Sequence, residues 1–197
     1  MKRCIWRSLA AGVLYLILQT SSSQAQIISG TEIPRFDFGA QFVGLPLEVP
    51  GTSDGIGVGV RAGYNFSHYV SLDGELDHFT FGTGPTQNSG TQLALVGVRA
   101  GVTMPEGGVY LKLRPGLVHF PRNGDFQSRG LTQLNHFALD AGFVLLRYFL
   151  NHTYLRLDLG DTVIPFGEGR IMNTSGQLVR VGTTNNAMIS FGFGLHF

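Results

Sequence analysis

The chain has 197 residues, enough for one domain or two, and 43% of them are hydrophobic, which excludes an intrinsically disordered protein. Charged residues make up 14% of the chain, against a usual level of about 25%, whereas glycine (28 residues) and phenylalanine (15 residues) are numerous. The formal net charge of +1 gives no basic excess of the kind that nucleic-acid binding requires, so no nucleic-acid partner is expected.

The first 25 residues have the pattern of a secretory signal peptide. Three basic residues precede an apolar run at 9–18, and small residues lead to a predicted cleavage site after Ala25. The run is too short for an uncleaved anchor, because a membrane-spanning helix needs roughly 20 apolar residues. Cleavage would remove Cys4, the chain's single cysteine, so no disulfide is expected in the mature protein. It would also remove three basic residues and no acidic ones, which changes the formal net charge from +1 to −2.

From residue 34 onward, apolar residues alternate with polar or small ones, in stretches separated by breaks. Glycine is too frequent for helices, so each stretch predicts a β-strand with one apolar face. The sixth stretch loses its regular alternation through "VLLRY", where a β-bulge would fit. The eight predicted strands cover residues 35–44, 56–66, 69–79, 92–102, 109–120, 134–147, 153–159 and 186–197.

The links between these strands alternate in length. Four are long, among them "LPLEVPGTSDG" and "PRNGDFQSRGLT", and three are short, such as "SH" and "FLNH". An even number of strands with short turns at one end and long loops at the other is typical of a bacterial outer-membrane barrel. The sequence therefore predicts an all-β fold, a closed eight-stranded antiparallel up-and-down transmembrane β-barrel. Within the last long link, which begins at Gly160, the segment 167–182 has strand-like ends and is expected to extend the final hairpin above the membrane.

The two faces of the strands carry different side chains. A soluble lipocalin-like barrel, apolar inside and polar outside, is the alternative to a membrane barrel. Six basic and six acidic residues lie opposite the apolar stripes, and this balance favours an enclosed interior of ion pairs. A tight turn centred on Ser67 would set Arg61 opposite Asp73. The predicted interior ion-pair network consists of Arg35, Asp37, Arg61, Asp73, Glu75, Asp77, Arg99, Lys112, Arg114, Asp140, Arg156 and Asp158.

Aromatic residues gather near the predicted strand ends. Outer-membrane barrels carry aromatic girdles at both membrane interfaces. The periplasmic girdle is predicted to hold Phe36, Phe66, Tyr69, Tyr148, Phe149 and Phe197, and the other girdle Phe79, Phe81 and Phe120.

These features give the chain a resemblance to a known family. The strand count, the loop asymmetry, "GYNFSHYVSLDGELDHF", "LKLRPG" and the terminal aromatic resemble the small eight-stranded outer-membrane β-barrel proteins. That group holds the outer membrane protein A transmembrane domain and the X-type and opacity-type proteins. The resemblance covers about residues 34–197 and implies a barrel domain over 26–197, after a signal peptide over 1–25. No peptidoglycan-binding domain follows the barrel, so anchoring through such a domain is not expected.

The resemblance also implies partners. In this family a C-terminal aromatic with alternating apolar residues resembles the signal that the barrel-assembly machinery reads. Outer-membrane lipid is the other implied partner, and a monomer is the expected state. The residues of this chain that match the assembly signal are Ile189, Phe191, Leu195 and Phe197.

Catalytic and cofactor chemistry find little support in the sequence. The six histidines are scattered without metal-ligand spacing, and "GIGVGVRAG" lies within a strand, where a dinucleotide fingerprint would not work. No catalytic residue, cofactor or metal is therefore predicted. Ser71 with Asp73, or His119 and His136 with Asp125, show no convincing catalytic arrangement.

The predicted function is structural or interactive. The sequence indicates an outer-membrane barrel with a filled polar interior and long surface loops for adhesion or recognition of a surface ligand. The alternative is a narrow porin-like channel for ions or small solutes. A lipid A-modifying barrel enzyme is less favoured.

Overall fold

The structure is a computed structural model, and it describes residues 34–46, 54–82, 90–121, 134–150, 152–167, 170–172, 177–180 and 182–197. The predicted signal peptide lies outside the described residues. No described segment is a helix long and apolar enough to cross a membrane.

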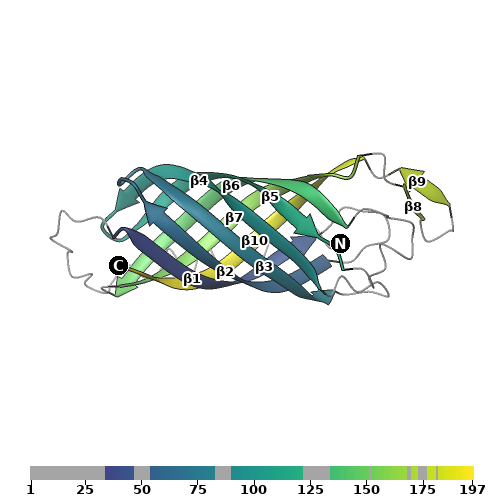
Figure 1. Ribbon diagram of the computed structural model, residues 1–197. Coiled ribbons are helices and arrows are strands. Elements are labelled where there is room, and N and C mark those ends of the chain that lie inside the picture. The colour runs from purple at the N-terminus through teal and green to yellow at the C-terminus, as the bar shows by residue number, and fades with distance from the viewer. Residues whose placement is uncertain are drawn as a thin grey trace, which may run out of the picture.

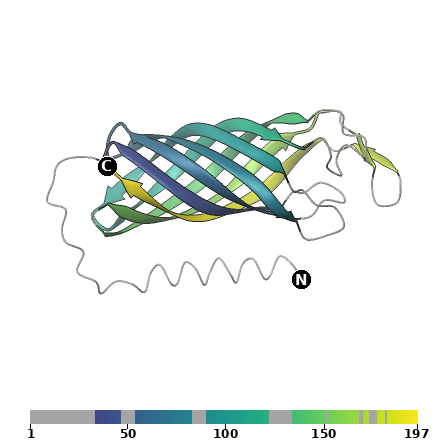
Figure 2. The ribbon, with the colours of Figure 1, turned by 60° about the horizontal axis from the view of Figure 1, so that its bottom comes forward.

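Eight strands form a closed barrel, as predicted, and each pairs antiparallel with its two neighbours in the order β1-β10-β7-β6-β5-β4-β3-β2 (Figures 1 and 2). Each barrel strand pairs with its neighbour along the chain, and β10 closes the barrel against β1. The barrel strands are β1 (Phe36–Pro46), β2 (Asp54–Asn65), β3 (Val70–Gly82), β4 (Thr91–Met104), β5 (Gly107–His119), β6 (Asn135–Leu150), β7 (Thr153–Pro165) and β10 (Thr183–His196).

The two ends of the barrel differ. The C-terminus lies at the end that carries the short turns, and a separate hairpin projects beyond the opposite end (Figure 1). This hairpin consists of β8 (Arg170–Met172) and β9 (Leu178–Arg180), which pair antiparallel in a two-stranded sheet. The strand-like ends predicted within 167–182 are thus confirmed.

The closing seam reaches the final residue of the chain. Phe197 donates its backbone N–H to the carbonyl of Phe36 at 2.9 Å, and Phe36 donates to the carbonyl of Phe197 at 3.1 Å. Further along the seam Phe42 pairs with Phe191. The terminal phenylalanine therefore completes the hydrogen-bond ladder of the barrel, which leaves no open sheet edge there.

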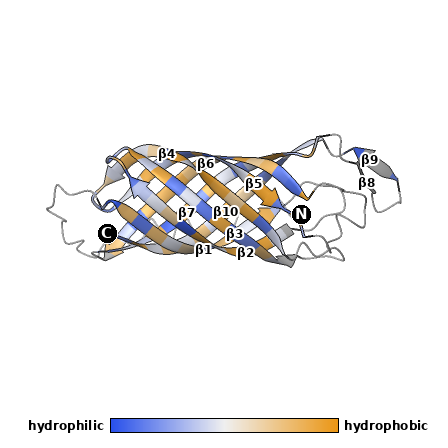
Figure 3. Cartoon of the chain, viewed as in Figure 1, coloured by the Kyte–Doolittle hydropathy of each residue, from blue (hydrophilic) through white to orange (hydrophobic). Residues whose placement is uncertain are grey.

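Apolar and polar residues alternate along the barrel strands (Figure 3), and exposed positions alternate with buried ones. Phe42 is 69% exposed and Leu111 60% exposed on the outside, whereas Asp73 and Arg114 are both 0% exposed. The outer face matches hydrocarbon and the inner face holds the charges, which confirms the predicted orientation. A soluble lipocalin-like barrel would show the opposite arrangement.

The register between β2 and β3 differs from the prediction. Arg61 pairs with Glu75 and Gly63 pairs with Asp73, so Arg61 and Asp73 do not face each other. The reason is the turn, which takes four residues: Phe66 donates its N–H to the carbonyl of Val70 at 3.0 Å. The turn is therefore centred one residue later than expected, and the predicted pair was wrong.

The predicted aromatic girdles need correction in part. Phe79 and Phe120 are buried in the barrel interior, because the alternation of β3 places Phe79 on the inner face and Phe120, directly after β5, continues the alternation of that strand. Tyr148 is partly buried against an inner cluster that includes Tyr154. The side chain of Phe81 lies outside the described residues. The aromatic residues that are exposed near the short turns are Phe36, Phe66, Tyr69, Phe149 and Phe197.

Strand β6 keeps its alternation through "VLLRY". Val144 and Leu146 point inward and are buried, and the register shift lies between Tyr148 and Leu150 at the end of the strand. The bulge expected within this stretch therefore falls at its end.

Candidate functional site: the barrel interior

The centre of the interior is an ion-pair cluster around Asp73 of β3. Arg156 donates to both carboxylate oxygens of Asp73, at 2.9 and 2.7 Å, and Arg114 donates to Oδ2 at 3.1 Å. Arg156 also donates two hydrogen bonds to the carboxylate of Asp158, at 2.7 and 2.9 Å. Arg99 approaches Asp73 at 3.9 Å. These bidentate contacts fix guanidinium and carboxylate groups in one geometry.

Arg114 extends this cluster to the neighbouring strands. It donates from Nε to Asp140 at 2.8 Å and from Nη1 to Glu75 at 2.6 Å. Lys112 lies 2.9 Å from Asp140 and 3.6 Å from Asp158. The ion pairs thus cross the lumen and connect β3, β5, β6 and β7.

A second group of contacts lies nearer the C-terminal end of the barrel. Arg99 pairs with Asp37 and stacks over the ring of Tyr110, with 5.4 Å between the guanidinium carbon and the ring centroid. Tyr154 donates its hydroxyl to Asp37 at 3.2 Å. This set ties β1 to β4 and β7.

Arg61 and Asp77 are connected through a glutamine that the sequence analysis did not identify. Gln41 accepts from Arg61 at 3.0 Å and donates to Asp77 at 2.8 Å. Gln41 pairs with Gly59, which in turn pairs with Asp77, so the absent side chain of Gly59 lets Gln41 reach across β2. Arg61 also lies over the ring of Tyr154 at 5.7 Å. The signal for Gln41 in the sequence is its position on the inner face of β1.

Arg35 does not belong to this arrangement. It precedes β1, is exposed, and lies 3.4 Å from the hydroxyl of Tyr64. We name the remaining predicted charges together with Gln41 the charged layer. Its five bases and six acids, all buried, are Arg61, Arg99, Lys112, Arg114, Arg156, Asp37, Asp73, Glu75, Asp77, Asp140 and Asp158.

The interior is not polar throughout. Towards the long loops, the inner faces of several strands carry apolar residues that are almost fully buried and pack in one cluster. The interior that the sequence predicts to be filled and polar thus also contains an apolar part. Inward positions in strands need no charge when neighbouring inward side chains can cover them with apolar surface. This apolar layer consists of Val43, Leu45, Phe79, Leu93, Leu95, Val118, Phe120, Ala138, Ile164, Phe166 and Met188.

Glycine at inner positions makes room for the charged layer. A Cβ atom added at Gly63 would lie 2.5–2.8 Å from the carboxylate of Asp37. Replacing Gly63 with alanine is therefore expected to displace Asp37 from Arg99 and to lower the free energy of unfolding by about 1–3 kcal/mol. Urea unfolding in detergent micelles measures the change.

The matched control is Gly74→Ala on β3. A Cβ atom there would meet a single carbonyl at the ordinary distance of 3.7 Å, so we expect no loss of stability. Equal losses for the two variants would contradict the role given to Gly63.

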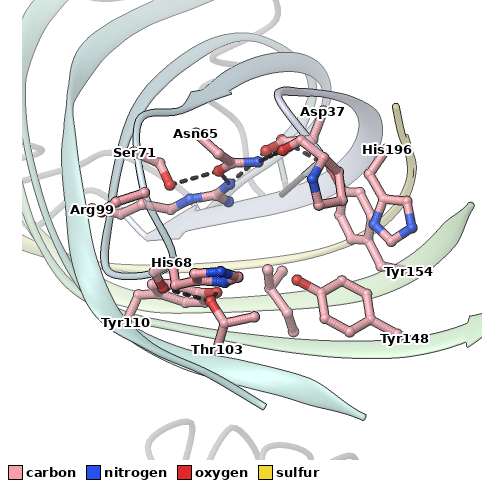
Figure 4. Close-up of a pocket in the computed structure, with 13 residues that line it drawn as sticks. Asp37, Asn65, His68, Ser71, Arg99, Thr103, Tyr110, Tyr148, Tyr154 and His196 are labelled. Atoms are coloured by element: carbon pink, nitrogen blue, oxygen red, sulfur yellow. Dashed lines mark hydrogen bonds and ion pairs between the residues drawn. The ribbon is translucent and has the colours of Figure 1, made fainter. Parts of the chain in front are cut away.

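A small polar cavity opens at the C-terminal end of the lumen (Figure 4). Asp37, Arg99, Tyr110 and Tyr154 contribute to its walls, and its volume is about 40 Å³. A water molecule needs roughly 10–15 Å³ of such space, so the cavity has room for a few water molecules.

The residues considered for catalysis or metal binding do not assemble in the described part of the chain. Ser71 donates its hydroxyl to Asn65 at 2.6 Å, and His119 bonds to the amide oxygen of Asn135 at 2.6 Å. Asp125 lies outside the described residues. Within the described ranges, no three His, Cys, Asp or Glu residues gather in a way that could hold a metal ion.

Comparison with known proteins identifies the family of the chain. A sequence model described as "Outer membrane protein beta-barrel domain" matches residues 10–197. The chain belongs to this outer-membrane β-barrel family. The protein is therefore an outer-membrane protein, which agrees with its apolar outer face. None of the curated proteins matches the sequence significantly.

Solved structures of the outer-membrane β-barrel type share the fold. Neisserial surface protein A (NspA) is 14% identical with a TM-score of 0.53, over 82% of this chain and 97% of that chain. Outer membrane protein H (OprH) from P. aeruginosa is 11% identical with a TM-score of 0.55, over 83% of this chain and 99% of that chain. At such low identity the likeness concerns the fold alone.

Proposed function

We propose that this family member is a monomeric barrel with a non-conducting lumen, whose long loops lie at the cell surface and act in adhesion or recognition. The observation that carries the proposal is that the charged layer and the apolar layer follow one another along the axis of one narrow barrel. Ion pairs cross the lumen in the charged layer, and the apolar layer lies between that layer and the long loops. Eight strands enclose an interior just wide enough for side chains.

An ion that entered this lumen would meet two obstacles. It would have to separate buried pairs such as Arg156–Asp73, at a desolvation cost of several kcal/mol per ion. It would then have to pass the apolar layer, which offers it no polar partner. These obstacles favour a structural or interactive role over the narrow channel.

Planar-bilayer recording tests this part of the proposal. The refolded protein is expected to give no steady conductance above background, while a porin in the same bilayer serves as the positive control. Reproducible unitary steps that scale with the amount of inserted barrel would overturn the sealed lumen and favour the channel.

Labelling of whole cells tests the surface role. Epitope tags are inserted in the four long links, at 47–53, 83–89, 122–133 and 173–176, and in the short turn at residues 105–106 as a control. Antibody is expected to bind the long-link tags on intact cells and the short-turn tag after permeabilisation alone. The reverse pattern would place the long loops in the periplasm.

We also propose that the protein is not an enzyme. The proposal is supported by the partners of the candidate groups, because Ser71 bonds to an amide oxygen and His119 to another amide. A nucleophile needs a base within hydrogen-bond reach. Unchanged lipid A and unchanged phospholipid after incubation with the refolded barrel, followed by mass spectrometry, are the expected result, and a modified lipid would refute it.

The C-terminal residues Ile189, Phe191, Leu195 and Phe197 are proposed as the signal for the barrel-assembly machinery. Phe191, Leu195 and Phe197 are exposed on the outer face, where another protein can contact them. Deleting Phe197 is expected to lower the amount of folded barrel in cells, while refolding in detergent changes less. Heat-modifiable migration on unheated gels measures both quantities. Equal amounts of folded barrel in cells with and without Phe197 would contradict the proposal.

A further inference from the structure

The charged layer holds one more acid than it holds bases. Its five bases and six acids are all buried, so in fully ionised form they would leave one uncompensated negative charge inside the barrel. A buried carboxylate without a partner loses so much solvation energy that the group is neutralised instead. The excess charge must therefore be balanced by a proton or a cation bound within the layer.

Asp77 of β3 is the acid that no base neutralises. In the described part of the chain each of the other five acids has a Lys or Arg nitrogen within 4.0 Å, whereas Asp77 has none. Its two register neighbours differ from those of a salt-bridged residue, because they are Gly59 on β2 and the buried Leu93 on β4. Asp77 is 0% exposed and lies at the border with the apolar layer, where burial disfavours a negative charge.

One oxygen of the Asp77 carboxyl group is already occupied as an acceptor. Gln41 donates from its amide nitrogen to Oδ1 of Asp77 at 2.8 Å. The amide of Gln41 cannot be turned round, because its oxygen accepts from Arg61 at 3.0 Å and an arginine can only donate. Oδ1 must therefore be an acceptor, and a proton on Asp77 belongs on Oδ2.

The other oxygen of Asp77 faces a second carboxyl group. Glu75 precedes Asp77 by two residues on the inner face of β3, and the two side chains lie within hydrogen-bond reach of each other. Oδ2 of Asp77 and Oε1 of Glu75 are both buried, and neither has a donor among the described residues. Two ionised carboxylates cannot bond to each other, since both are acceptors. A single proton between these two oxygens satisfies both.

We propose that Asp77 and Glu75 bind one proton between them. Asp77 is the carboxylic acid and donates from Oδ2 to Oε1 of Glu75, which is the carboxylate. With this proton the ionised groups of the charged layer balance. Neighbouring carboxyl groups share a proton because two like charges in contact cannot both form at low cost. The site depends neither on the surface role of the loops nor on the sealed lumen, so it goes beyond the proposed function and is tested separately.

The surrounding charges assign the two roles within the pair. Arg114 donates to Oε2 of Glu75 at 2.6 Å and makes no ion pair with Asp77, so Glu75 is the member that stays ionised. Loss of the proton would place a second negative charge on Asp77, where no base is in contact. The other charged groups around the pair are Arg61 of β2, Asp73 of β3, Lys112 of β5, Asp140 of β6 and Asp158 of β7, while β1 and β4 contribute the uncharged Gln41, Leu93 and Leu95.

Infrared spectroscopy of the refolded barrel detects the proton directly. The barrel is held in lauryldimethylamine oxide, a detergent without a carbonyl group, at about pH 7, where ordinary carboxyl groups are ionised. The native protein is expected to show the carbonyl stretch of a carboxylic acid, with a shift in D₂O. Asp77→Asn is expected to lack this band. The matched control Asp161→Asn, which changes an exposed aspartate of β7, is expected to keep it.

Urea unfolding in the same detergent measures the linkage between the proton and stability. Between about pH 5 and about pH 7 the unfolded chain has lost this proton and the native barrel keeps it. Unfolding therefore releases one proton, and its equilibrium constant is expected to rise about tenfold per pH unit relative to that of Asp77→Asn. Stability thus falls as the pH rises. Groups that titrate alike in both proteins, histidines among them, cancel in this ratio.

Asp77→Asn is expected to refold and to be at least as stable as the native barrel at about pH 7. Its amide nitrogen can donate to Glu75 as the acid did, and its oxygen can still accept from Gln41. Asp140→Asn is the contrasting variant, because Asp140 pairs with Lys112 at 2.9 Å. Its unfolding constant is expected to rise at least about tenfold, since a buried base loses its partner.

Several results would overturn the shared proton. They are the absence of the acid band from the native barrel, its persistence in Asp77→Asn, equal pH dependence of unfolding in these two proteins, and failure of Asp77→Asn to refold. A native barrel that lacks the band and is more stable in sodium chloride than in choline chloride of equal ionic strength would hold a cation at the pair, which also refutes the proton.

Discussion

Replacing Arg156 with methionine is expected to lower the free energy of unfolding by about 3–5 kcal/mol. Arg156 is fully buried and makes four hydrogen bonds with Asp73 and Asp158. Methionine keeps the apolar stem but leaves two buried carboxylates without this partner. Urea unfolding in detergent micelles, followed by heat-modifiable gel migration, measures the loss.

The control is Arg147→Met at the short-turn end of the barrel. Arg147 pairs with Glu106 at 2.7 Å, but the glutamate side chain is 56% exposed, so water screens the pair. Its loss is expected to cost about 0–1 kcal/mol. An equal loss of stability in both variants would show that the contribution of Arg156 to the free energy of unfolding does not depend on its burial in the charged layer.

Double-mutant cycles measure the energetic coupling between two residues and so distinguish pairs in direct contact from pairs that only lie near each other in the charged layer. Arg156 and Asp73 are expected to show strong energetic coupling, because they touch through two hydrogen bonds. Arg61 and Asp73 are expected to show weak coupling, since Arg61 pairs in register with Glu75 and bonds to Gln41. Weak coupling between Arg156 and Asp73 together with strong coupling between Arg61 and Asp73 would instead support the register expected from the sequence.

Truncating Phe120 to alanine is expected to cost about 3–5 kcal/mol, because it opens a cavity in the apolar layer. Phe120 is fully buried and contacts His136 and Phe166, with ring centroids 5.9 Å away in both cases. His136 lies in β6 and Phe166 directly follows β7, so we expect these neighbours to fill little of the space. Urea unfolding in lipid vesicles measures the loss.

Phe137→Ala is the matched control for Phe120→Ala. Phe137 is 48% exposed on the outer face of β6. Lipid chains can fill the space that its ring leaves, so its truncation lacks the cavity penalty and is expected to cost less than that of Phe120. A larger loss for Phe137 would show that the apolar layer contributes little to stability.

Much of the fold could be predicted from the sequence because membrane strands alternate in a period of two. The outward positions Phe38, Val60 and Leu111 repeat on that period, and they are exposed as expected. The closure of the barrel followed from the same pattern, since an unpaired edge strand cannot lie in lipid.

The interior was harder to predict because alternation says which face a residue lies on and not what it touches. Leu95 lies between the outward residues Ala94 and Val96 of β4, so both faces there are apolar and the pattern gives no signal for a layer inside the barrel. The pairing of Arg61 depended on a turn whose hydrogen bonds the sequence does not display. Gln41 acquires its role through Gly59 on another strand.

The reciprocal hydrogen bonds between Phe36 and Phe197 join the beginning of the barrel to its very end. Until the last residue has crossed the inner membrane, β1 has no partner on one side. The unpaired backbone N–H and C=O groups of that edge can then pair with other polypeptides. A fold that depends on so distant a pairing forms slowly, since a long loop must close before the contact is made. The chain must therefore stay open until its last strand is available to pair with β1.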